Sequence, residues 1–444
     1  MASLRLISRR SFSVAVAAEE AHPFIRPFGC TRRLFLQDPY YSPAALSALA
    51  QDIHTLTQNE AINSVLIGPE EPNNMLSYIR DLDLQYAFSD DYTHGYPDEN
   101  HLVSGVLDPS VPLTTPMLQH AQALAKALRG DPNDTKVPTI AVLDGYLHDA
   151  GAAWLQSSYV IGTSHSFLQV QNPCRGLSFD PVGLSYRLKY MKGPFRRSIA
   201  LILGLTGYTA NADDLFATGL VTHQIETPSE LGILENVLAQ LPSWKDQALI
   251  HVPKRNYGDR HSDRDHNRSF RNVTVADAIE AYCGGLELAW DEATACMDAS
   301  LDPEFEEHMP TLESTLVNYA ATLDDLLEMA KTPEDVMEAL QQVAAEEHPD
   351  DPEEQEGVEV AKKLLKGMQK ASPLALSAIF RLVDEPGKTF EACLEQEMTV
   401  QQRLIQGPDY ASWQEREEGW THSSLKAVTN DEVEALFQPQ EASK

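Results

Sequence analysis

The residues best suited to chemistry lie between His148 and Asp180. His148 and Asp149 could pair as a catalytic dyad, but chain neighbours on a turn rarely reach the geometry of proton transfer, so a surface turn is favoured. Cys174 and His165 could supply a nucleophile and a base, although no orienting group is evident and an incidental thiol is the simpler interpretation. Asp180 could act as an acid or base, or could cap or bridge a core loop. These two roles of Asp180 stay open.

A polar stretch at residues 254–271 holds two further clusters. The run from His261 to His266 offers nitrogen and oxygen ligands, but its spacing fits neither zincin nor EF-hand patterns. We therefore expect a solvated loop there, and no metal or cofactor. The same stretch interleaves cations with aromatic side chains, which suits RNA backbone contact and base stacking, although three aspartates favour an ordinary charged loop. These side chains are Lys254, Arg255, Tyr257, Arg260, Arg264, Arg268, Phe270 and Arg271.

The composition is that of an acidic globular protein. With 444 residues, 43% of them hydrophobic, the chain can bury a substantial core in one elaborated domain or in two. A formal net charge of −32 opposes broad, nonspecific binding to nucleic acid or anionic lipid. No apolar run approaches the roughly 18 residues of a membrane-spanning helix, which excludes a membrane span. Five cysteines without a Cys-x-x-Cys pair indicate reduced thiols.

Residues 1–25 have the character of a mitochondrial presequence. Arg5, Arg9 and Arg10 alternate with apolar side chains, and no acid precedes Glu19. A potential helix with one cationic face and one apolar face is what mitochondrial import requires. The sequence therefore predicts a protein of the mitochondrial matrix, with an ordinary N-terminus as the alternative.

Strand and helix signals alternate from residue 26 to residue 225. Such mixed units predict a layered α/β architecture. Short apolar or β-branched runs predict strands at 33–36, 62–67 and 138–143, and apolar spacing predicts helices at 43–56, 116–128 and 194–206.

The second part, residues 226–444, is predicted to be mostly helical. Helical spacing is strongest at 275–290, 323–345 and 358–368. Two polar stretches, 254–271 and 346–356, interrupt it and are predicted as surface loops because they cannot bury enough apolar area to offset the entropy of ordering.

Several short motifs occur in a fixed order between Thr139 and His223: Asp144-Gly145-Tyr146, the run Gly176–Gly183, Leu205-Thr206-Gly207 and Thr222-His223. This stretch resembles the 3-hydroxyisobutyryl-CoA hydrolase branch of the crotonase (enoyl-CoA hydratase/isomerase) superfamily. Residues 397–409 are similar to the helical extension of that branch. The resemblance implies an α/β fold, with a crotonase-like core of stacked ββα turns and a mostly helical C-terminal extension. Such cores usually form trimers, so a homo-oligomer is one expectation, although the altered helices leave the oligomeric state open.

The family cleaves thioesters by holding the carbonyl oxygen between two backbone N–H groups. The resemblance places one donor in the turn 148–151, which makes Ala150 and Gly151 the expected oxyanion and substrate-binding residues. The family has three glycines there, and the Asp149 carboxylate would repel an oxyanion. The second donor would come from 68–76, where two prolines and two acids replace the family's paired glycines. We expect that donor to be missing.

The family's catalytic glutamate falls at Gln171 or Asn172, according to the register chosen. Neither side chain can act as a nucleophile or base near neutral pH. Asp180 lies one position from the family's aspartate, because Phe-Pro-Asp has become Phe179-Asp180-Pro181. The expected catalytic positions are therefore Asp180 and Gln171, with Gln171 inactive.

Two functions follow from the resemblance. The first is a catalytically degenerate relative kept for binding or structure, such as a component of the small subunit of the mitochondrial ribosome, where relatives of this hydrolase occur. Its partners would be ribosomal RNA and proteins. The second is an active 3-hydroxyisobutyryl-CoA hydrolase of valine catabolism, with an acyl-CoA substrate and with Asp180 and a substitute base as its catalytic groups. Losing the glutamate and an oxyanion donor would each cost roughly a hundredfold to ten-thousandfold in rate, which favours the first.

Overall fold

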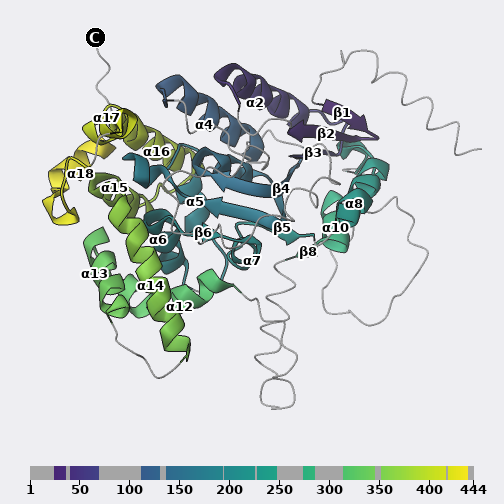
Figure 1. The fold of residues 1–444 in the computed structure, drawn as a ribbon. Helices are drawn as coiled ribbons and strands as arrows, with labels where there is room; N and C mark the ends of the chain where they lie inside the picture. Colours follow the sequence, from purple (N-terminus) through teal and green to yellow (C-terminus); the bar gives the residue numbers. More distant parts are fainter. Residues whose placement is uncertain are drawn as a thin grey trace, which may run out of the picture.

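A mixed β-sheet forms the centre of the protein (Figure 1). The computed structural model describes residues 25–36, 41–69, 112–130, 137–193, 195–225, 228–247, 274–285, 314–345, 352–416 and 419–438. The strands of the sheet are β1 (Ile25–Phe28), β2 (Thr31–Leu36), β3 (Ser64–Pro69), β4 (Thr139–His148), β5 (Tyr159–Gln169), β6 (Thr209–Ala210), β7 (His223–Gln224) and β8 (Gly284–Gly285).

The sheet order is β1-β2-β3-β4-β5-β7-β8, and β6 pairs with β5. Strands β2, β3, β4, β5 and β7 are mutually parallel, whereas β1, β6 and β8 pair antiparallel with their neighbours. Because parallel strands end at the same edge, the carboxyl ends of β4 and β5 place their following loops side by side.

The helices preceding residue 286 are α2 (Pro43–Thr57), α4 (Thr115–Arg129), η2 (Asp149–Gln156), η3 (Asn172–Arg175), α5 (Leu184–Lys189), α6 (Arg196–Thr206), α7 (Ala212–Ala217), α8 (Pro228–Gln240), α9 (Trp244–Gln247) and α10 (Val275–Tyr282). Those after it are α12 (Thr315–Met329), α13 (Pro333–Ala344), α14 (Pro352–Lys370), α15 (Pro373–Asp384), α16 (Phe390–Ile405), α17 (Pro408–Glu415), η6 (Leu425–Ala427) and α18 (Asn430–Phe437).

The central strands are buried on both faces. In β4, Ile140 and Val142 pack with α8 and α10 in one apolar cluster, whereas Ala141 and Leu143 belong to a larger cluster with α2, α4, α6 and the C-terminal helices. This alternation follows from the two-residue period of a strand. The green and yellow C-terminal helices accordingly lie on one side of the sheet and α8 and α10 on the other (Figure 1).

The buried carboxylate of Asp214 joins helix α12 to the core. Its Oδ1 accepts hydrogen bonds from Ser314 Oγ at 2.9 Å and from the Leu316 N–H at 2.8 Å, at the start of α12. Its Oδ2 accepts from Tyr208 Oη at 2.9 Å and from the Asn211 N–H at 3.1 Å, at the start of α7. The carboxylate therefore fixes the two helix N-termini relative to each other.

The predicted α/β architecture is confirmed, as are the predicted strands and the helices at 43–56, 116–128, 194–206 and 358–368. The single helix predicted at 323–345 is wrong: α12 ends at Met329 and α13 begins at Pro333, because Thr332 caps the second helix and proline favours its first turn.

Two other boundaries differ from the sequence prediction. Helix α10 ends at Tyr282, before the two-residue strand β8, because Gly284 and Gly285 follow it, whereas 275–290 was expected to be one helix. Helix α14 begins at Pro352, inside the stretch 346–356 that was predicted as a loop, again with proline at the first helical position.

Several predictions fall outside the described residues. These concern the presequence, except for Ile25, the stretch 254–271, the part of 68–76 beyond Pro69, and residues 346–351. Among the helices that are described, none is long and apolar enough to cross a membrane.

Candidate functional site

The candidate site lies where β4 and β5 end. His148, the last residue of β4, pairs in register with Gln169, the last residue of β5. The next residue after β4 is Asp149, whose φ of 42° is in the left-handed region that side chains other than glycine rarely adopt. This backbone conformation accompanies an Asp149 side chain that reaches the segment following β5.

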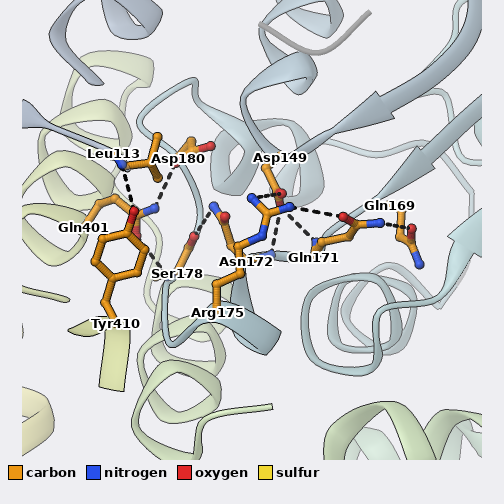
Figure 2. Close-up of polar contacts among 10 residues, drawn as sticks. All are labelled: Leu113, Asp149, Gln169, Gln171, Asn172, Arg175, Ser178, Asp180, Gln401 and Tyr410. Carbon is orange, nitrogen blue, oxygen red and sulfur yellow. Dashed lines mark hydrogen bonds and ion pairs between the residues drawn. The ribbon is translucent and has the colours of Figure 1, made fainter. Parts of the chain in front are cut away.

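The Asp149 carboxylate is almost fully buried and binds that segment. Its Oδ1 accepts hydrogen bonds from the N–H groups of Gln171 at 2.8 Å and Asn172 at 3.0 Å. Arg175 Nη1 lies 3.8 Å from Asp149 Oδ2, and Arg175 Nη2 donates to Gln171 Oε1 at 3.2 Å. Gln171 Nε2 in turn donates to Gln169 Oε1 at 2.7 Å. These contacts form the right half of the network in Figure 2.

The left half of the network connects the same segment to helix α16 (Figure 2). Asn172 Nδ2 donates to the Ser178 carbonyl oxygen at 2.8 Å, and the Ser178 N–H donates to Gln401 Oε1 at 2.9 Å. Gln401 Nε2 donates to Asp180 Oδ1 at 2.8 Å. Polar contacts therefore run without interruption from Gln169 to α16.

Glu397 precedes Gln401 by one helical turn and holds the following part of the loop. Its Oε2 accepts from the Gly183 N–H at 2.7 Å, and its Oε1 accepts from the Ser185 N–H at 2.8 Å and from Ser185 Oγ at 2.7 Å. Residues four apart lie on one face of a helix, so α16 presents both side chains to residues 178–185. We call this segment the 178–185 loop.

Helix α17 covers η3. Gly176 ends η3 with a φ of 74°, and a Cβ there would lie 2.8 Å from the Cβ of Asp409, which requires glycine at this position. The Arg175 guanidinium lies 5.7 Å from the centroid of the Trp413 ring. Tyr410 Oη accepts from the Leu113 N–H at 2.7 Å, which connects α17 to the segment before α4.

Parts of the chain resemble proteins of the enoyl-CoA hydratase/isomerase group. Residues 286–437 match the family model described as Enoyl-CoA hydratase/isomerase. The chain is 24% identical over 311 residues to the mitochondrial 3-hydroxyisobutyryl-CoA hydrolase of Mus musculus, and 22% identical over 309 residues to that of Homo sapiens. Both alignments span 68% of this chain but only 63% of the relative's length.

Solved structures share the fold. A carnitinyl-CoA dehydratase from Mycobacterium thermoresistibile has a TM-score of 0.58 at 15% identity, covering 94% of this chain and 96% of its own. An enoyl-CoA hydratase from Rhodobacter sphaeroides has a TM-score of 0.54 at 15% identity, covering 94% and 97%. The chain has a crotonase-like fold and is distantly similar in sequence to the mitochondrial 3-hydroxyisobutyryl-CoA hydrolases. The predicted crotonase-like core with a mostly helical C-terminal region is thereby confirmed.

This crotonase-like protein brings most of the residues predicted from the sequence into one place. Gln171 and Asn172 both contact Asp149, and Asp180 joins the same network through Gln401. Ala150 and Gly151 are buried in the first turn of η2. A 3-10 helix that begins at Asp149 leaves the Ala150 N–H outside its i to i+3 hydrogen bonds. Of the two residues expected to hold an oxyanion, Ala150 is therefore better placed than Gly151 to donate its N–H.

Other predictions are corrected. The surface-turn interpretation of His148 and Asp149 is wrong, because both side chains are buried. They also do not form a dyad, since the carboxylate binds the Gln171 and Asn172 N–H groups instead. His165 Nδ1 lies 3.6 Å from Asp144 Oδ1, and no contact within the described chain joins it to Cys174. Among the residues that the structure describes, no group of three or more His, Cys, Asp or Glu side chains could hold a metal.

Sequence reasoning missed Arg175, Glu397 and Gln401. A signal for the last two existed: Glu397 and Gln401 lie four residues apart on the same helix as the apolar, buried Leu394, Val400 and Leu404. Polar side chains within the buried face of an amphipathic helix require internal partners.

Burial changes the ionisation of the site. It raises the pKa of Asp180 to about 7, an effect that the neighbouring charge of Asp149 reinforces and that Gln401, Arg175 and Asn172 oppose. Burial also raises the pKa of Glu397 to about 7, against its hydrogen bonds from Ser185 and Gly183. The pKa of His148 is lowered to about 4 by burial and by the charge of Arg175, which keeps the imidazole neutral.

Asp149 and Asp180 are both buried, and the charge of Asp149 raises the pKa of Asp180. Burial raises the pKa of Asp149 as well, while Arg175 and the N–H groups of Asn172 and Gln171 oppose this rise. Three donors surround Asp149, whereas Asp180 Oδ1 accepts from Gln401. Donors stabilise the ionised form, so the N–H groups and Arg175 oppose the effect of burial at Asp149, as Gln401 and Asn172 do at Asp180.

Proposed function

We propose that this protein is a catalytically degenerate relative of 3-hydroxyisobutyryl-CoA hydrolase, retained for a binding or structural role. The observation that carries this proposal is the Asp149 carboxylate, buried against the N–H groups of Gln171 and Asn172. A carboxylate next to the expected oxyanion donor Ala150 disfavours an oxyanion, and the two positions of the family glutamate carry amides.

The polar network supports a structural rather than a chemical use of these residues. Gln171, Asn172 and Asp180 each bind another protein group: Gln169, the Ser178 carbonyl and Gln401, respectively. An acid or base must instead be free to reach the substrate proton. Loss of the proton-transfer group and of an oxyanion donor would together leave little turnover.

The setting proposed for this role is the mitochondrial matrix, with the small subunit of the mitochondrial ribosome as the partner. Support comes from the cationic presequence pattern, from relatives whose names place them in mitochondria, and from the cation and aromatic pattern at 254–271. A local basic segment in a chain of net charge −32 is suited to one defined RNA contact.

The lack of turnover is testable with purified protein and 3-hydroxyisobutyryl-CoA, following release of free CoA thiol. We expect no release above the uncatalysed background, with an authentic 3-hydroxyisobutyryl-CoA hydrolase as the positive control. Asp180→Asn should leave this result unchanged. Turnover that is abolished by Asp180→Asn but kept by the exposed control Asp213→Asn would establish the second candidate, an active thioester hydrolase, which the raised pKa of Asp180 favours.

The ribosomal role predicts comigration with mitochondrial small subunits on a density gradient at low salt. Changing Arg264, Arg268 and Arg271 to glutamine should shift the protein to the soluble fractions, because phosphate contacts are lost. The matched control changes three exposed lysines of α14, Lys362, Lys363 and Lys366, and should still comigrate. Wild-type protein found only in soluble fractions contradicts this role.

A further inference from the structure

Three donors converge on the Asp149 side chain at the end of β4 (Figure 2). Two are the backbone N–H groups of Gln171 and Asn172, and the third is the Arg175 guanidinium. A pair of N–H groups with a guanidinium is the chemistry by which proteins hold carboxylate ligands. Asp149 is 7% exposed, and its Oδ2 makes no hydrogen bond within the described chain beyond the 3.8 Å approach of Arg175.

Contacts other than those of Asp149 hold these donors in place. Gln171 Oε1 accepts from Arg175 Nη2, and Trp413 lies beside the guanidinium. The Asn172 side chain is fixed on the Ser178 carbonyl at 2.8 Å. We therefore expect the donors to keep their positions when the carboxylate is removed.

The backbone of Asp149 points to the same conclusion. Its φ of 42° is unfavourable for an aspartate and favourable for glycine. The carboxylate contacts must offset this cost in the native protein. Replacement by glycine deletes the carboxylate without adding backbone strain, so it leaves the donors unoccupied in an otherwise compatible turn.

We propose that the N–H groups of Gln171 and Asn172 and the Arg175 guanidinium form an anion-binding cradle whose resident ligand is the protein's own Asp149 carboxylate. Once that side chain is deleted, the cradle takes a small free carboxylate such as acetate. The corollary that Asp149 keeps an acyl thioester out of the site rests on the function proposed above, whereas the cradle itself rests on the geometry alone.

The test is chemical rescue of Asp149→Gly, followed by thermal unfolding at pH 8. We expect the variant to unfold several degrees below wild type, because three buried donors lose their acceptor. Sodium acetate should raise its midpoint in a saturable way, relative to sodium chloride at equal ionic strength, and should leave wild type unchanged. Acetamide, which is neutral and of similar shape, should have no such effect.

Two further variants test the roles of the Arg175 cation and of the Asp149 charge separately. Arg175→Gln in the Asp149→Gly background should abolish the response to acetate, because the cation of the cradle is lost. Asp149→Asn keeps an oxygen for the two N–H groups and tests the charge even if Asp149→Gly does not fold: its midpoint at pH 8 should lie below that of wild type, without a response to acetate.

Three outcomes would overturn the cradle: a folded Asp149→Gly variant that does not respond to acetate, equal rescue by acetate and acetamide, which indicates simple filling of a void, or an Asp149→Asn variant as stable as wild type. None of these results depends on thioester turnover. A failed rescue therefore leaves the proposed function standing, and turnover by the wild-type protein would leave the cradle standing.

Discussion

Asp214→Ala is expected to lower the free energy of unfolding by about 3–5 kcal/mol. The buried carboxylate accepts four hydrogen bonds, and its removal leaves Ser314, Leu316, Tyr208 and Asn211 with unpaired donors at the starts of α7 and α12. Each buried donor without a partner costs about 1–3 kcal/mol, and water entering the gap recovers part of that cost. Urea unfolding followed by circular dichroism measures the change.

The neighbouring Asp213 provides the matched control. Its side chain is exposed in the same first turn of α7, so Asp213→Ala removes the same charge from the same helix N-terminus without emptying a buried site. We expect a loss below about 1 kcal/mol for this control. Similar losses in the two variants would show that helix electrostatics, and not the junction between core and C-terminal helices, explains the effect.

Asp180 and Glu397 are expected to lower the free energy of unfolding as the pH rises from about 4 to about 8, and Asp180→Asn with Glu397→Gln should remove this decrease. The lowered pKa of His148 acts in the opposite direction up to its ordinary value of 6.5, and it does so equally in wild type and in the double variant. Burial raises the pKa of both carboxyls in the folded protein to about 7, from 3.8 for Asp180 and 4.5 for Glu397. At these two carboxyls the folded state therefore binds more protons than the unfolded state in this window. The stabilisation is complete below pH 4 and is lost as the pH passes through 7.

Each shift corresponds to about 3–4 kcal/mol by linkage, and the two overlap because the charge of Asp180 also raises the pKa of Glu397. Urea unfolding at pH 5 and pH 8 would measure the difference for wild type and the double variant. The exposed pair Asp213→Asn and Glu395→Gln serves as the control and should keep the wild-type slope. An unchanged slope in the Asp180 and Glu397 variant would show that neither carboxyl holds a proton in the folded state.

The pattern of apolar residues within a segment was sufficient to predict those strands and helices whose buried side chains follow the period of the element. Strand β3 and helices α2 and α4 follow from β-branched runs and helical spacing. Strand β5 was not predicted, because residues 163–166 are polar. In the structure Thr163 Oγ1 donates to Asp144 Oδ1 at 2.8 Å, and Ser166 Oγ donates to the Leu143 carbonyl at 2.9 Å. These partners belong to β4, so no pattern within β5 indicates them.

The candidate site also combines features that are visible within a segment and features that depend on partners elsewhere in the chain. Short motifs that keep their order led from the sequence to Gln171 or Asn172 and to Asp180, and the structure connects these three residues through one network. The burial of Asp149 could not be predicted, since its carboxylate is satisfied by N–H groups 22 and 23 residues later in the chain. The sequence alone indicates a polar turn at Asp149. The pairing of β4 with β5 is what places the Asp149 side chain in the interior.

Helix α16 also has a consequence for the order of events during synthesis. Its contacts with the 178–185 loop join residues that are 212 to 223 positions apart in the chain. While the ribosome is still producing the intervening segment, the Ser178, Gly183 and Ser185 N–H groups lack their native acceptors. The 178–185 loop therefore cannot complete its native packing until α16 has emerged from the ribosome.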